Sequence, residues 1–344
     1  MHGECEPPGG KLVAADAGVA GGRLARVQVS GDFFPEPGVP GRLSAALTGI
    51  PADADAGVIT ARITAALGGD AVPAGGAAAL RRALTRGSGW RDHDWRLVRE
   101  EPREPALHMA LDEVLAREVA AGRRAPTLRI WEWSVPAVVI GSFQSLRNEV
   151  DLAEARRLGM TVVRRISGGG AMFIDPASTI TYSLYAPGSL VAGMSLAESY
   201  RYLDDWVIGT LTEDLGLSAW HEPLNDIASA RGKIGGGAQR RLAGGTVLHH
   251  VTMAYDIDAG AMTRVLRTGR EKLSDKGIPS AVKQVDPLRR QTRLPRAKVI
   301  DLLADHFRRR YGLSADTVTG GELLAARDLA RAKFASSQWT ARVP

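Results

Sequence analysis

The chain has 344 residues, of which 44% are hydrophobic and 24% are charged, and this balance predicts a soluble globular protein with room for a large and a small domain. No run approaches the roughly 18 apolar residues of a membrane span, and the acidic, proline-containing start is not a signal peptide, so we expect a cytoplasmic protein with no membrane partner. The single cysteine, Cys5, has no partner for a disulfide or a structural metal site, and we expect its terminal segment to be mobile.

A net charge of +6 and an isoelectric point near 9.7 favour an acidic ligand or partner. The charge is mostly scattered arginine, with local clusters at Arg289-Arg290 and Arg308–Arg310. Because zinc-finger spacing and RNA-binding aromatic signatures are absent, nucleic acid is a weak candidate. A solvated helical face and a basic surface for an acidic protein are the other interpretations.

The first predicted elements belong to a small α/β domain. Leu12–Ala15 and Leu24–Val29 flank a Gly21-Gly22 turn, which indicates a β-hairpin. Weakly helical stretches follow near residues 43–47, 58–67 and 77–86. A short Gly-Ser-Gly linker comes next, so we expect one domain over residues 1–87 and a second over residues 88–344.

The second domain begins with an amphipathic helix over Leu107–Leu115, whose leucine and valine side chains share one side. Trp131 lies in the strand-like segment that follows and is a candidate core aromatic residue. Further elements are predicted in chain order: strands over 127–133 and 137–141, a helix over 196–217, a strand over 254–258 and a terminal helix over 323–334. We expect the terminal helix and Trp339 to dock onto this domain.

A glycine-rich motif runs from Arg165 through Ser167 to Gly170, preceded by β-branched residues and followed by the alternating run Thr179–Tyr185. We interpret it as two strands joined by a glycine loop. The amides of such a loop can converge on an anion or a carbonyl oxygen, and Arg165 can pair with a phosphate or carboxylate. A tight hairpin without a ligand is the plain structural alternative.

A second, similar motif follows Asn225-Asp226. Gly232–Ala238 contains Lys233 and reads as another glycine turn between strands, and His249-His250 follow it. Two such loops, each with a basic residue, imply one polyanionic ligand held between strands. The structural alternatives are a solvated turn lysine, turn caps at Asn225 and Asp226, and core or surface histidines.

In this order the motifs resemble the successive signatures of lipoate–protein ligases, within the biotin/lipoate ligase family. The resemblance implies an α+β fold in which a mixed, largely antiparallel sheet is flanked by helices, as in class II aminoacyl-tRNA synthetases and biotin ligases. It also implies that the front unit is the α/β accessory domain of these ligases, fused at the N-terminus and supporting the activation step.

The function implied by the resemblance is ATP-dependent activation of lipoate to lipoyl-AMP, followed by transfer of the lipoyl group to a lysine of a lipoyl domain. ATP and Mg²⁺ are the implied cofactors, and lipoate is the implied substrate. The implied acceptors are the acidic lipoyl domains of 2-oxoacid dehydrogenase E2 subunits and the glycine cleavage H protein. A monomer that binds no nucleic acid is expected.

The same resemblance makes Lys233 and Arg165 the catalytic residues, because two cations can offset the repulsion between a carboxylate and an α-phosphate. Asp226 is the candidate ligand for Mg²⁺. The residues expected to bind lipoate or ATP are Trp131, Ser167, Gly168, Gly169, Gly170, Met172, Asn225, Asp226, Ala238 and His250. The segment Lys272–Ser280 resembles a ligase loop that covers the adenylate.

Two departures from the family pattern leave the acyl-chain preference open: Ile174 stands where many ligases have histidine, and Gly235 and Gly237 stand where serines are frequent. The nearest alternative function is a cysteine-dependent octanoyltransferase of the same fold. Its thiolate nucleophile would belong in residues 218–223, which contain no cysteine. Biotin–protein ligase would carry a Gly-Arg-Gly-Arg loop, which is absent. An inactive binding module or a nucleic-acid-binding regulator would also explain the basic isoelectric point.

Overall fold

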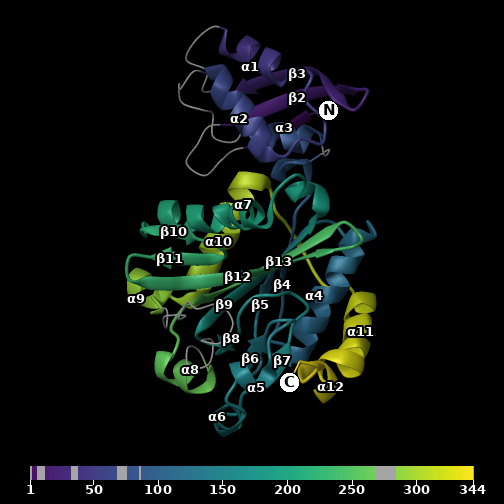
Figure 1. Cartoon of the computed structure of the whole chain (residues 1–344). Coiled ribbons are helices and arrows are strands. Elements are labelled where there is room, and N and C mark those ends of the chain that lie inside the picture. The colour runs from purple at the N-terminus through teal and green to yellow at the C-terminus, as the bar shows by residue number, and fades with distance from the viewer. Residues whose placement is uncertain are drawn as a thin grey trace. The chain divides into compact units, whose positions relative to one another are not determined.

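A computed structural model describes residues 2–5, 12–31, 38–67, 76–84, 87–267 and 284–343. The chain divides into two compact units, shown in Figure 1: residues 1–93 with 188–203, and residues 94–187 with 204–344. The boundary after His93 lies close to the expected linker, whereas the membership of residues 188–203 in the first unit had no sequence signal.

The first unit contains a three-stranded antiparallel sheet in the order β1-β2-β3. Its N-terminal part comprises β1 (His2–Cys5), β2 (Val13–Ala20), β3 (Arg23–Gly31), α1 (Val39–Leu47), α2 (Ala56–Leu67) and α3 (Gly76–Leu84). The predicted hairpin is β2–β3, and its turn residues Gly21 and Gly22 have φ angles of 56° and 72°, which glycine adopts at little cost. Cys5, which was expected to lie in a mobile segment, belongs to β1, whose pairing with β2 places it opposite Val13.

The second unit contains an eight-stranded sheet, counted over the described residues, in the order β10-β11-β12-β13-β9-β5-β4-β14. Its strands are β4 (Arg96–Arg99), β5 (Thr127–Trp131), β9 (Thr179–Pro187), β10 (Ala219–Glu222), β11 (Asp226–Ser229), β12 (Gly232–Leu242), β13 (Thr246–Ala254) and β14 (Ser314–Asp316). β14, β4 and β5 are parallel, and the other neighbouring pairs are antiparallel. The mixed, largely antiparallel sheet is therefore confirmed.

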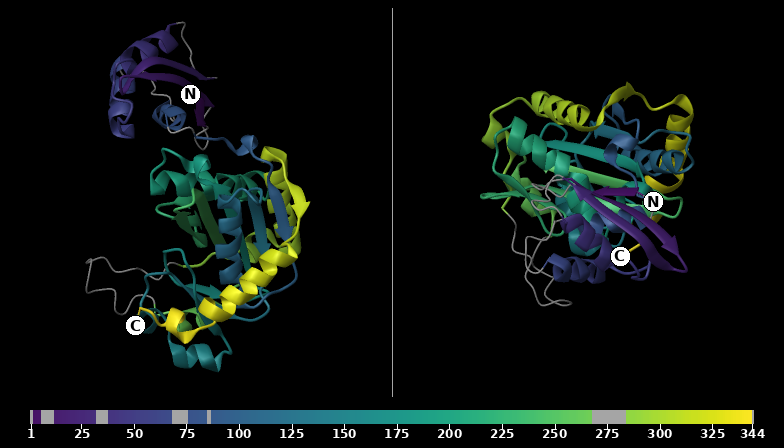
Figure 2. Two further views of the ribbon diagram at one scale, coloured as in Figure 1. Left: turned by 90° about the vertical axis from the view of Figure 1, so that its right-hand side faces the viewer. Right: turned by 90° about the horizontal axis from the view of Figure 1, so that it is seen from above.

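Helices cover both faces of this sheet. α4 (Pro105–Ala120) packs on β9 and β13, and α11 (Gly320–Leu329) packs on α4 and continues as a π-helical turn, Ala330–Phe334 (Figures 1 and 2). On the other face, Trp206 of α7 (Leu196–Gly209) meets Phe307 of α10 (Arg296–Tyr311) edge to face. The other helices of the unit are α5 (Leu146–Glu149), α6 (Leu152–Arg157), α8 (Ala259–Val265), α9 (Leu288–Thr292) and α12 (Ser337–Thr340).

A separate three-stranded sheet carries the first glycine motif. Its order is β7 (Thr161–Arg164), β6 (Ala137–Ile140) and β8 (Met172–Ile174), with β6 parallel to β7 and antiparallel to β8. The glycine loop does join two strands, β7 and β8, but the strand predicted to follow it, Thr179–Tyr185, belongs to β9 of the large sheet. Because β7 and β8 both pair with β6 and not with each other, the loop crosses the end of β6 and does not close a hairpin.

Two predictions near the end of the chain had different outcomes. The terminal helix docks as expected, since Trp339 Nε1 donates to Arg164 O at 2.9 Å and Phe334 is fully buried. The strand expected over residues 254–258 is wrong, because β13 ends at Ala254 and Asp258 caps α8 by accepting from Ala261 N. The segment Lys272–Ser280 lies outside the described residues. Among those that are described, no helix has both the length and the apolar character needed to cross a bilayer.

Candidate functional site

The glycine loop between β7 and β8 is braced by Arg165, which is 3% exposed. Its guanidinium donates to the carbonyl oxygens of Gly168 (3.1 Å), Gly170 (2.8 Å) and Val139 (3.2 Å), and Nε also donates to Ser167 Oγ at 3.0 Å. Arg165 was expected to offer its charge to an anionic ligand. In the structure this charge holds the loop in shape, and a ligand contact stays a prediction.

Two glycines make the loop possible. Gly169 has a φ of 85°, in the left-handed region that other residues rarely adopt. Gly141, just after β6, passes under the loop, and a Cβ at this position would lie 2.2 Å from Gly169 O. The peptides at Gly168 and Gly170 turn their carbonyls toward Arg165. In a trans peptide the following amide points the opposite way, so the N–H groups of Gly169 and Ala171 face away from the guanidinium.

The second glycine motif is a strand, which corrects the predicted turn. β12 runs through Gly232–Leu242 with one register shift against β11, opposite Ile227 and Ala228, and Gly235–Gly237 are paired with β13 without positive φ angles. Gly236 leaves space for the side chain of Lys233, which lies over it. A Cβ added at Gly236 would be 2.6 Å from Lys233 Nζ. Lys233 Nζ pairs with Asp226 Oδ1 of β11 at 2.7 Å.

The two motifs meet on β12. A Cβ at Gly169 would lie 3.6 Å from Ala238 Cβ and 3.9 Å from Gly237 O. Gly237 N in turn donates to Asn225 O at 2.8 Å. One surface of the sheet therefore brings together the first loop with the predicted residues Asn225, Asp226, Lys233 and Ala238.

His250 connects this surface to the protein core. Its Nε2 lies 2.7 Å from Ser167 Oγ, and its Nδ1 lies 2.8 Å from Asp112 Oδ2 of α4. Its neighbour His249 points to the other face of the sheet and contacts Asp204 at 2.6 Å. Sequence reasoning missed Asp112 because it followed only the apolar side of the helix. The sequence did contain a signal: Asp112 is a carboxylate within an apolar helical run. A carboxylate buried there needs hydrogen-bonding partners, which would have marked it as a candidate site residue.

The electrostatics of this core follow from burial. Burial lowers the pKa of His250, opposed by the hydrogen bond and charge of Asp112 and reinforced by Arg165 and His249. Burial and the Asp112 charge raise the pKa of Tyr185 well above its usual value. A neutral imidazole carries one N–H, and the carboxylate of Asp112 only accepts. His250 therefore donates a hydrogen bond from Nδ1 to Asp112 and accepts one at Nε2 from the Ser167 hydroxyl.

The predicted acyl-binding residues Trp131 and Met172 lie in or against the core next to His250. Trp131 is 2% exposed, its Nε1 donates to Ser183 Oγ at 3.1 Å, and its ring is 6.2 Å from that of His250. Met172 is half-buried against the cluster that contains Trp131, Trp133 and Ile174. Both side chains belong to the apolar packing of the core, and their contact with an acyl chain stays a prediction.

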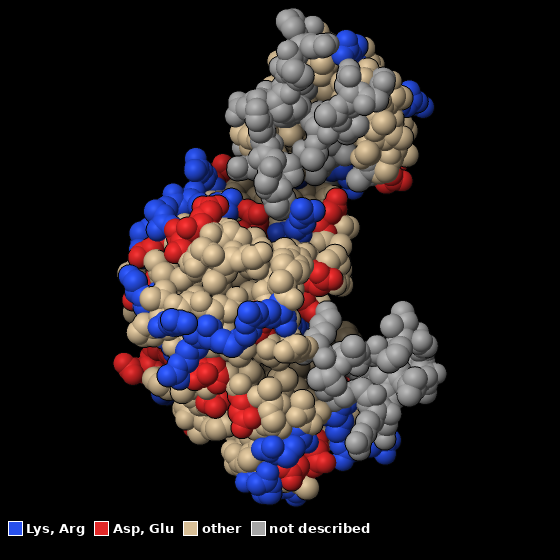
Figure 3. Space-filling view, turned by 90° about the vertical axis from the view of Figure 1, so that its left-hand side faces the viewer, with Lys and Arg blue, Asp and Glu red and all other residues tan. Residues whose placement is uncertain are grey.

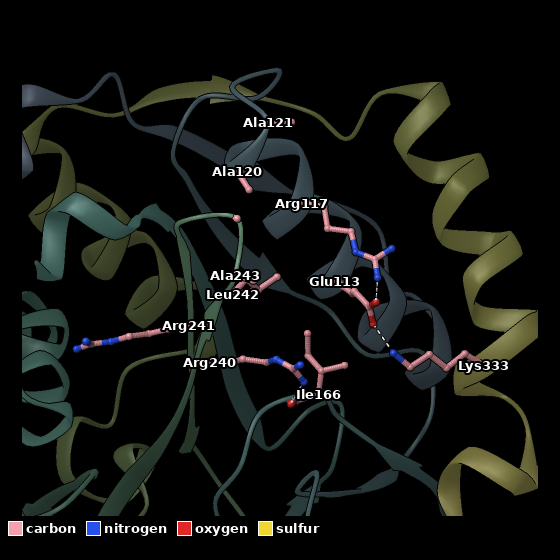
Figure 4. Close-up of a pocket in the computed structure, with 11 residues that line it drawn as sticks. Glu113, Arg117, Ala120, Ala121, Ile166, Arg240, Arg241, Leu242, Ala243 and Lys333 are labelled. Atoms are coloured by element: carbon pink, nitrogen blue, oxygen red, sulfur yellow. Dashed lines mark hydrogen bonds and ion pairs between the residues drawn. The ribbon is translucent and has the colours of Figure 1, made fainter.

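A pocket of about 490 Å³ lies beside Ile166, which is one of its lining residues (Figure 4). Arg240 borders it and donates to Ile166 O at 2.7 Å, while Glu113 lies between Arg117 and Lys333. The lining residues are Glu113, Arg117, Ala120, Ala121, Ile166, Arg240, Arg241, Leu242, Ala243, Gly244 and Lys333. With four basic residues against one acidic residue, the pocket has an excess of positive charge.

Outside this pocket, the two predicted arginine clusters form ion pairs. The arginines of the two predicted clusters each contact an aspartate; the pairs are Arg289–Asp256, Arg290–Asp286, Arg308–Asp305, Arg309–Asp214 and Arg310–Asp205. Figure 3 likewise shows basic and acidic residues interspersed on one face, apart from a short basic band across the second unit. The clusters therefore fit the interpretation as solvated, ion-paired helical faces.

The carboxylate next to Lys233 that is a candidate metal ligand belongs to Asp226. No group of three or more His, Cys, Asp or Glu side chains suited to a metal occurs in the part of the chain that the structure describes. A single carboxylate such as that of Asp226 is compatible with Mg²⁺. This ion usually keeps several waters and binds through one or two carboxylates together with substrate phosphates.

Comparison with known proteins shows the family to which this chain belongs. A family model described as the lipoyl protein ligase A/B catalytic domain matches residues 104–308. The octanoyltransferase LipM of Symbiobacterium thermophilum is 31% identical over 280 residues, covering 72% of this chain and 98% of that protein.

Two solved structures are similar over most of their own length. A chain from the Thermoplasma acidophilum lipoylation system, a bipartite lipoate protein ligase with its E2 lipoyl domain, has 27% identity and a TM-score of 0.63, covering 73% of this chain and 98% of that one. Lipoate-protein ligase A bound with ATP has 25% identity and a TM-score of 0.62, covering 73% and 100%. The chain described here, in agreement with its sequence motifs, belongs to the lipoyl protein ligase A/B catalytic domain family.

Proposed function

We propose that this protein is an ATP-dependent lipoate–protein ligase that forms lipoyl-AMP and transfers the lipoyl group to a lysine of a lipoyl domain. The observation that carries the proposal is the Lys233–Asp226 pair on the glycine-lined surface beside the Gly168–Gly170 loop. A carboxylate and an α-phosphate repel each other, and a positive charge between them lowers the barrier to their reaction. The first unit is assigned the accessory role in activation.

In this mechanism Lys233 contacts the lipoate carboxylate and the α-phosphate and stabilises the charge that develops on the phosphoryl oxygens. The amides of Gly169 and Ala171, which point away from Arg165, face a bound anion. Arg165 holds these amides in place through its bonds to the loop carbonyls. Asp226 would offer a carboxylate oxygen to Mg²⁺. That ion, when bound, would supply further charge neutralisation at the phosphates.

The second candidate is an octanoyl or lipoyl transferase that takes its acyl group from a carrier or another activated donor. The name of the S. thermophilum relative favours it. Transfer through a thioester needs a cysteine thiolate in the site. The chain's one cysteine, Cys5, belongs to β1 of the first unit and lies outside the family match over 104–308. We therefore favour the ligase.

A two-arm assay separates the candidates. With ATP, Mg²⁺, lipoate and an apo lipoyl domain, we expect mass spectrometry to detect lipoylated acceptor. With octanoyl carrier protein and no ATP, we expect unmodified acceptor. The Cys5→Ser variant should retain the activity of the first arm. Acceptor modification in the second arm only, together with a thioester on Cys5, would support the transferase and contradict the ligase.

The basic pocket beside Ile166 is the surface we propose for the acidic acceptor, such as an E2 lipoyl domain or the glycine cleavage H protein. Arg117 reaches it from α4 with a side chain that is 61% exposed. We expect Arg117→Ala to raise the KM for the apo domain about two- to fivefold, since exposed charges contribute modestly to association. Arg123→Ala, which removes an exposed arginine paired with Glu118, is the matched control. An equal change in both variants would place the acceptor elsewhere.

A further inference from the structure

The glycine loop is tied to α4 by a chain of hydrogen bonds between buried side chains. Asp112 Oδ2 is 2.8 Å from His250 Nδ1, His250 Nε2 is 2.7 Å from Ser167 Oγ, and Arg165 Nε is 3.0 Å from the same Oγ. Arg165 then holds the carbonyls of Gly168 and Gly170. A continuous path therefore leads from a helix carboxylate to the loop backbone.

Each proton in this path has a defined place. Asp112 Oδ1 accepts from Ser183 Oγ at 2.9 Å and from Tyr185 OH at 2.6 Å, and Oδ2, as the second oxygen of a carboxylate, can likewise only accept. His250 must then donate from Nδ1, which leaves Nε2 to accept from Ser167. The Ser167 oxygen accepts from Arg165 in its turn. Reversing the His250 tautomer would point two N–H donors at Ser167 Oγ and leave its hydroxyl hydrogen without the His250 acceptor.

We infer that Asp112 is a positioning residue, which acts through His250 on Ser167 and sets the geometry of the Gly168–Gly170 loop for the acyl headgroup. The inference rests on the proposed function of this loop. Supporting groups that orient a binding or reacting group commonly contribute about ten- to a hundredfold to activity.

The same order of groups occurs in Ser–His–Asp enzymes, where the serine attacks the substrate. Here Ser167 is 1% exposed, and its Oγ is also held by Arg165. These contacts favour a positioning role over a nucleophilic one. An octanoyl or lipoyl ester found on Ser167 after incubation with an acyl thioester would overturn this assignment.

The test uses the full-length Asp112→Asn variant. An amide can donate to His250 Nδ1 and shift the ring to the Nε2–H tautomer, which ¹⁵N NMR of the imidazole distinguishes. We expect this shift, altered amide resonances of Gly168–Gly170, and a KM for lipoate raised about tenfold, with the KM for ATP unchanged. Glu118→Gln, on the same helix but paired with Arg123, is the control and should match wild type.

The outcomes separate this inference from the ligase proposal. A wild-type protein that makes no lipoyl-adenylate contradicts the ligase proposal, while the NMR readouts still test the positioning role. Unchanged loop resonances and an unchanged lipoate KM in a folded Asp112→Asn variant would overturn the inference. If this variant does not fold, the wild-type spectrum decides: an Nε2–H tautomer of His250 would be incompatible with the proposed chain.

Discussion

Replacing Lys233 by alanine is expected to slow lipoyl-adenylate formation by about 100- to 1,000-fold, because a preorganised group that meets developing charge has an effect of this size in other enzymes. The ammonium group lies 2.7 Å from Asp226 and above the open backbone of Gly236. The measurement is pyrophosphate release at saturating ATP and lipoate. If the Lys233→Ala variant forms the adenylate at the wild-type rate, Lys233 has no catalytic role.

The control for this variant is Lys298→Ala, which removes an exposed lysine from α10. Both variants should unfold near the wild-type temperature. Lys233 is about one-third exposed at the sheet surface, so its loss creates no core cavity. A large drop in thermal stability of Lys233→Ala alone would indicate a structural role.

The Gly141→Ala variant is expected to lose activity about 100-fold, since displacing a binding group by about 1 Å can have an effect of this size. The new Cβ would lie 2.2 Å from Gly169 O, and both partners are backbone, so the loop must move. Arg165 would be displaced with it, because its Nη2 is 3.3 Å from the same Cβ position. The KM for lipoate and the rate of adenylation measure the effect.

A suitable control is Gly320→Ala at the start of α11, where an added Cβ meets no atom within 4 Å. This variant should have wild-type activity. Wild-type kinetics in Gly141→Ala would show that the loop tolerates displacement and that its position is not critical.

The comparison of sequence and structure is most informative at the two glycine motifs. Their order and the basic residues beside them were sufficient to indicate the family, the sheet class and the shared surface of Lys233, Asp226 and the first loop. The interpretation failed where glycine was taken to mean a turn. In β12, Gly236 leaves space for the Lys233 ammonium, and a strand that needs such space has the same local composition as a loop.

The amino-acid sequence by itself was sufficient to predict the β2–β3 hairpin, α4 and β5, because hydrophobic periodicity and turn residues act over a few positions. The tertiary structure decided which polar groups meet. Asp112 and His250 are 138 residues apart in the chain, and Arg165 meets Val139 O of β6, which is 26 residues away. A buried polar group forms hydrogen bonds with the groups that the packed strands and helices bring near it. These partners are distant in the chain, so no periodic pattern in the sequence predicts them.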